Sequence, residues 1–154
     1  CGRSTPCRTE SIQAQELITR LRSGFPEREV DLDRLEIRVK AQRDDEQKYA
    51  AARKSLELHD NPEKCLETLA EAERPTPRME ELERRAAIRY HEKRAQQARR
   101  DGRYDDAIAE YEILIQTAPA RTAELTGLIG ETRRERDLVV QAEVAVQQGD
   151  QEAA

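Results

Sequence analysis

The chain is poor in the residues from which thick hydrophobic cores are built. Of its 154 residues, 36% are hydrophobic and 3% aromatic, with no tryptophan and a single methionine. Globular domains are usually about 45–50% apolar when glycine is counted. A large central core is therefore not expected. No apolar run approaches the roughly 18 residues that a membrane-spanning helix needs, so the sequence predicts no such helix.

Motifs for catalysis and for cofactor binding are also missing. The two histidines, His59 and His91, lie neither at a metal-ligand spacing nor beside a cysteine pair. The chain has no glycine-rich phosphate loop and no Gly-x-Ser-x-Gly nucleophile elbow. The consecutive carboxylates Asp44, Asp45 and Glu46 would point in different directions on a helix, so they do not form an acid–base pair. We expect a non-catalytic protein without metal or cofactor.

Charge and aromatic content do not favour a nucleic-acid partner. The net charge is -5, and the chain is 38% charged with only six glycines and six prolines. This balance is typical of helical arrays with thin buried seams and hydrated outer faces. Base stacking needs more aromatic side chains than the five present. These are Phe25, Tyr49, Tyr90, Tyr104 and Tyr111.

Apolar residues recur at helical spacing along most of the chain, and most prolines and glycines lie between the periodic stretches. Residues 1–10 are expected to form a flexible tether, with Ser11 as the N-cap of the first helix. The remainder, 11–154, is predicted to be a single all-α domain of about six helices. The predicted helices span residues 11–22, 27–58, 62–73, 78–100, 104–117 and 121–148.

The segment around Gly102 has the residue spacing of a tight helical hairpin. A glycine ends one helix, small residues at the crossing allow close approach, tyrosines fill the groove and a proline closes the unit. The residues concerned are Ala95, Gly102, Tyr104, Ala107, Tyr111 and Pro119. This pattern resembles the tetratricopeptide repeat. The resemblance implies a solenoid of helical hairpins whose leading helices line a concave face that binds peptides or partner helices.

The resemblance is strongest over residues 88–119, and weaker copies occupy 46–77 and 138–154, the last with Gly149 as its turn. The family repeat has 34 residues, so the leading helices here are elongated. Cys65 stands at a small-residue position and is expected to be a buried spacer. At an offset of 42 residues, the places of Gly102, Ala107, Tyr111 and Pro119 are taken by Asp60, Cys65, Leu69 and Pro77.

A row of basic residues recurs along the predicted helix 78–100. Guanidinium and ammonium groups in a row suit carboxylates or phosphates. One interpretation is a solvated face with ordinary ion pairs, and the other is a groove wall that binds an acidic segment of a protein partner. The hypothesis is a protein-interaction scaffold, and the alternative is a structural bundle or coiled-coil subunit that self-associates. The row consists of Arg85, Arg89, Lys93 and Arg100.

The chain begins with Cys1 followed by the polar run Gly-Arg-Ser-Thr-Pro. This start resembles a mature bacterial lipoprotein, whose N-terminal cysteine carries the lipid. The resemblance implies a membrane anchor on Cys1, a place on the periplasmic side of a bacterial membrane, and a role in assembling an envelope, pilus or secretion complex. The alternative is a cytoplasmic protein in which this cysteine has no such role.

Overall fold

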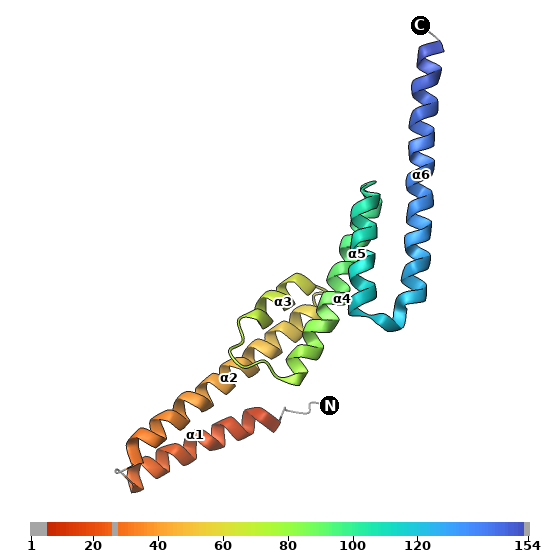
Figure 1. Ribbon diagram of the computed structural model, residues 1–154. Coiled ribbons are helices and arrows are strands. Elements are labelled where there is room, and N and C mark those ends of the chain that lie inside the picture. The colour runs from red at the N-terminus through yellow and green to blue at the C-terminus, as the bar shows by residue number, and fades with distance from the viewer. Residues whose placement is uncertain (1–5, 26–27, 153–154) are drawn as a thin grey trace. The chain divides into compact units, whose positions relative to one another are not determined.

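The computed structural model describes residues 6–25 and 28–152, and within these ranges the chain is all-α, without strands (Figure 1). A short 3-10 helix, η2 (Pro119–Arg121), precedes the last helix. The predicted all-α fold of about six helices is confirmed. The α-helices are α1 (Pro6–Gly24), α2 (Glu29–Glu57), α3 (Pro62–Ala70), α4 (Pro77–Arg100), α5 (Tyr104–Thr117) and α6 (Thr122–Glu152).

The largest departures from the predicted helix boundaries lie near the two ends of the chain and in α3. Helix α1 begins at Pro6, before the predicted N-cap Ser11 and inside the range assigned to a tether. Helix α3 ends at Ala70, three residues short of its predicted end at Glu73. Helix α6 continues through Gly149, so the turn predicted there is not formed. A glycine inside a helix costs only about 0.5–1 kcal/mol relative to alanine.

The chain divides into two compact units, Cys1–Glu83 and Arg84–Ala154. The division falls inside α4, so the first turns of this helix belong to the first unit and the remaining turns to the second. The single helical domain predicted over residues 11–154 stays a prediction.

In the first unit, α1 lies along the N-terminal half of α2. Ile18 and Leu32 are buried, and the Gln15 amide donates a hydrogen bond to Glu36 at 3.1 Å. Arg22 pairs with both Asp33 and Glu36. Most other large apolar side chains of this hairpin stay exposed, in keeping with the thin core that the composition predicts. They are Ile12, Leu17, Leu21, Phe25, Val30, Leu35 and Ile37.

The C-terminal half of α2 packs against α3. Ala52 and Leu56 on α2 and Cys65 on α3 are fully buried, and Leu69 is 7% exposed. Cys65 is thus a buried thiol among apolar neighbours, in keeping with a spacer role. Burial of these side chains is the main stabilising contribution to the α2–α3 hairpin, at about 25 cal/mol per Å² of buried apolar surface.

The turns α2–α3 and α4–α5 share one backbone feature. Asp60 has φ +46° and Gly102 has φ +73°, both in the left-handed region. After α4, the amide of Gly102 donates to the carbonyl of Arg99 at 3.2 Å, and that of Arg103 to the carbonyl of Ala98 at 2.8 Å, which is the Schellman arrangement at a helix end. The two residues with left-handed backbone are therefore separated by 42 residues, the offset between the two repeat copies predicted from the sequence.

The second unit has one hydrophobic cluster, which α4, α5 and α6 build together. Alanines at the α4–α5 crossing allow the two helices to approach closely. Arg99 of α4 binds Glu135 of α6, with Nε 2.7 Å from Oε2, and this bond lowers the pKa of the Glu135 carboxyl. The buried members of the cluster are Ala95, Ala98, Ala107, Ile108, Tyr111, Leu114, Leu125 and Ile129.

Candidate protein-interaction site

Five of the six residues that suggested the hairpin lie at the α4–α5 turn or on the packing surface of the hairpin, and Pro119 lies after the other end of α5. Ala95 and Ala107 are fully buried, and Tyr111 is 4% exposed. Tyr104 begins α5 and is half-buried. Gly102 holds the left-handed turn position described above, and the exposed Pro119 begins η2.

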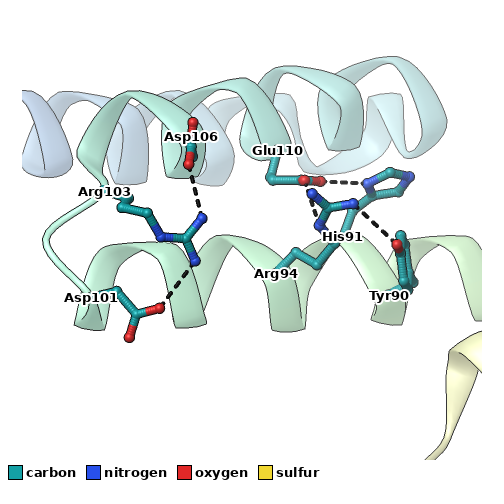
Figure 2. Close-up of polar contacts among 7 residues, drawn as sticks. All are labelled: Tyr90, His91, Arg94, Asp101, Arg103, Asp106 and Glu110. Atoms are coloured by element: carbon teal, nitrogen blue, oxygen red, sulfur yellow. Dashed lines mark hydrogen bonds and ion pairs between the residues drawn. The ribbon is translucent and has the colours of Figure 1, made fainter.

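Glu110 is the centre of a polar seam between α4 and α5 that the sequence analysis did not predict (Figure 2). Its carboxylate is buried, with Oε2 2.6 Å from His91 Nδ1 and Oε1 2.8 Å from Arg94 Nε. Arg94 also donates a hydrogen bond to the Tyr90 hydroxyl at 3.1 Å. Its pKa is raised, first by that hydrogen bond and then by the charge of Glu110. The seam satisfies a carboxylate that would be costly to bury alone.

The same seam continues at the turn, where Arg103 bridges the two helices. One guanidinium nitrogen lies 3.0 Å from Asp101 at the end of α4, and another lies 2.9 Å from Asp106 in the first turn of α5 (Figure 2). These two acceptors raise the pKa of Arg103. Arg94 and Arg103 therefore act inside the hairpin. Neither belongs to the row of basic residues predicted from the sequence, Arg85, Arg89, Lys93 and Arg100, which we call the α4 stripe.

The register of the hairpin is the signal that would have revealed this seam. Residues of an antiparallel helix pair that lie about equally far from the turn face each other. His91 and Glu110 lie at similar distances on either side of Gly102. A search for charged pairs about that glycine would have brought them together.

The four residues of the α4 stripe are all exposed. With about 3.6 residues per turn, Arg89, Lys93 and Arg100 lie on the side of α4 opposite to the buried Ala95 and Ala98. The stripe therefore belongs to the outer surface of the second unit. Arg85, Arg89 and Lys93 follow one another at four-residue intervals, and Arg100 lies seven residues further along the helix.

Asp45 has a role that the sequence analysis missed. It is 4% exposed, and its two carboxylate oxygens accept hydrogen bonds from the backbone amides of Glu73 and Arg74, at 3.0 and 3.2 Å. Lys48, one turn later, donates to the Glu71 carbonyl. The two side chains thus tie the segment after α3 to α2. Asp45 is a structural capping group in the first unit and is not paired with Asp44 or Glu46 for acid–base chemistry.

Other candidate chemistry is limited in the part of the chain that the structure describes. No cluster of three or more His, Cys, Asp or Glu side chains there is arranged to hold a metal ion. None of the helices described combines the length and apolar character required to cross a bilayer. Cys1, the predicted lipid anchor, lies outside the described residues.

The exposed cations of the α4 stripe are therefore the candidate binding residues of the second unit. Comparison of the chain with protein-family models, with curated proteins and with solved structures finds no match.

Proposed function

We propose that the chain is a non-catalytic protein-interaction scaffold whose α4 stripe binds an acidic segment of a partner protein. The observation that carries the proposal is the exposure of the four stripe residues along one helix, three of which, Arg89, Lys93 and Arg100, lie on the side away from the core of the second unit. A helix that is held by buried contacts on one side has little backbone conformational entropy left to lose when its opposite side binds a partner.

The dimensions of the stripe suit an extended peptide. From Arg85 to Arg100 the helix rises about 22 Å, at about 1.5 Å per residue. An extended chain covers about 3.3–3.6 Å per residue, so about six or seven partner residues match the stripe. Carboxylates on such a segment would accept charge-assisted hydrogen bonds from the guanidinium groups. Complementary charge contributes mainly to association rate and specificity.

Reversing two stripe charges, Arg89→Glu with Lys93→Glu, is expected to abolish capture of the partner from an extract of the cells that express the protein. The helical circular dichroism signal and the melting temperature should change little, because exposed ion pairs contribute only about 0–1 kcal/mol. Capture by the unaltered chain should also weaken as salt rises, because exposed charges are screened beyond about 8 Å at physiological ionic strength.

A matched control is the double reversal Arg38→Glu with Lys40→Glu, at two exposed positions of α2. It changes the net charge by the same amount in the other unit. Partner capture that survives the α4 reversal, or that is lost equally in the control, would contradict the stripe as the binding site.

A second candidate function is a structural subunit that self-associates, and the observation in its favour is the C-terminal half of α6. This helix continues past the α4–α5 turn (Figure 1). In the structural candidate, this stretch forms the contact between helices of two copies. Its exposed apolar side chains are Leu138, Val139, Val140, Val144 and Val146.

Sedimentation of the purified chain, with and without Val139→Lys, separates the two candidates. The scaffold proposal expects a monomer in both cases, because its binding surface lies on α4. The structural candidate expects a dimer that Val139→Lys dissociates, because a lysine charge in an apolar helix contact is costly to desolvate. Gln141→Lys, at an exposed position of the same helix, is the control and should leave the mass unchanged in either case.

A further inference from the structure

A groove runs along α2 in the first unit. It consists of two adjoining hollows of about 540 and 400 Å³, which share Glu46, Tyr49 and Arg78. One wall is the face of α2 from Gln42 to the end of the helix, followed by Leu58, and the other is the segment 74–79, which includes the first turn of α4. At about 1.5 Å per residue, the α2 wall is about 24 Å long. We refer to this surface as the α2 groove.

The α2 groove has an apolar floor and an anchored wall. Tyr49, which is half-buried, and Met79, which is 4% exposed, both line the larger hollow, so one aromatic ring and one thioether contribute to its apolar surface. The wall at Arg74 is tied to α2 through its backbone amide, which donates to the buried carboxylate of Asp45. A groove whose wall is anchored in this way is formed before a ligand arrives, which reduces the ordering cost of binding.

The charges that line the groove do not balance within the protein. Asp45 is engaged by two backbone amides, and Glu57 pairs with Arg53 at 2.8 Å. Among the described residues no carboxylate forms an ion pair with Lys54, Arg74 or Arg78. The lining carries four cationic side chains, Arg53, Lys54, Arg74 and Arg78, against three carboxylates, Asp45, Glu46 and Glu57. This is a local positive excess in a chain whose net charge is -5.

We propose that the α2 groove binds a short acidic segment of a partner protein that carries one bulky apolar side chain. The apolar side chain would pack on Tyr49 and Met79, and flanking carboxylates would pair with Arg74 and Arg78. Aromatic and aliphatic anchors in preformed pockets, with charged groups at the rim, are the common pattern of peptide recognition. The inference deepens the proposed scaffold function by adding a second docking surface, in the other unit.

The test uses a displayed library of random dodecapeptides selected on the full chain. Selected peptides are expected to combine a Leu, Ile or Phe with two or more Asp or Glu residues. A dye-labelled synthetic copy of one such peptide is then titrated by fluorescence anisotropy. Its Kd should rise by about tenfold or more in Arg74→Glu with Arg78→Glu, because attraction becomes repulsion at both rim positions. Rising salt should weaken the same complex.

Two further variants keep the outcome interpretable. Arg78→Gln removes one charge without reversal and should give a smaller loss of affinity with an unchanged melting temperature. The α4 stripe reversal, Arg89→Glu with Lys93→Glu, should leave the peptide Kd unchanged. Absence of selected peptides, selection of peptides without carboxylates, or a Kd insensitive to Arg74 and Arg78 would overturn the inference. Loss of peptide binding in the α4 stripe reversal alone would also overturn the α2 groove as the binding site, while leaving the proposed scaffold function in place.

Discussion

Replacing Asp45 with alanine is expected to lower the free energy of unfolding of the first unit by about 2–3 kcal/mol. The carboxylate is 4% exposed and accepts from the amides of Glu73 and Arg74. Hydrogen bonds to a charged group contribute more than neutral ones, and their loss leaves two backbone donors without this partner. Urea unfolding followed by circular dichroism measures the change.

Asp44→Ala is the matched control, because Asp44 is the neighbouring residue on the same helix and is exposed. It should shift the urea midpoint by little, since substitutions at exposed helix positions are usually within about 0.5 kcal/mol. Asp45→Asn keeps one acceptor oxygen and should be intermediate. Equal midpoints for Asp44→Ala and Asp45→Ala would show that the link between α2 and the segment after α3 contributes nothing to stability. Because that link anchors the wall of the α2 groove, Asp45→Ala should also weaken peptide binding there.

Ala107→Leu is expected to destabilise the α4–α5 hairpin by about 1–3 kcal/mol, because added methylene groups in a packed interior force neighbouring side chains out of their rotamers. Ala107 is fully buried beside Tyr111 and Leu114. A loss of 1 kcal/mol lowers Tm by roughly 2–4 °C in a chain of this size. Thermal unfolding of the two purified proteins measures the effect.

The control for this change is Ala109→Leu, two residues further along α5 and exposed. Leucine and alanine have similar helix propensities, so an outward leucine should leave Tm nearly unchanged. Identical Tm values for the two leucine variants would contradict the assignment of Ala107 to a close helix crossing.

Local signals were sufficient for most helix ends. Glycine at Gly102 and the pair Asn61 and Pro62 predicted turns that the structure contains, because each acts through its own backbone. A glycine adopts φ +73° without a Cβ clash, and the Asn61 side chain accepts from the amide of Lys64. Helix α5 begins and ends where its sequence pattern predicts.

The seam around Glu110 and the cap at Asp45 were missed for a different reason. Both carboxylates bond to groups many residues away, at His91 and at the backbone of Glu73 and Arg74. A carboxylate on a helix has the same sequence pattern whether it meets water or a buried partner. The outcome depends on which helices pack together and in which register.

By itself, the sequence determined the all-α class, the positions of most turns and the scarcity of buried apolar surface, since these follow from periodicity, backbone preferences and composition. Only the tertiary structure decided which side chains share a seam and which apolar residues remain exposed. Leu17 and Leu35 have the helical spacing of core residues, yet they stay exposed beside the buried Ile18 and Leu32. The apolar faces of α1 and of the N-terminal half of α2 are wider than the contact between these two helices can cover, so packing selects which residues are buried.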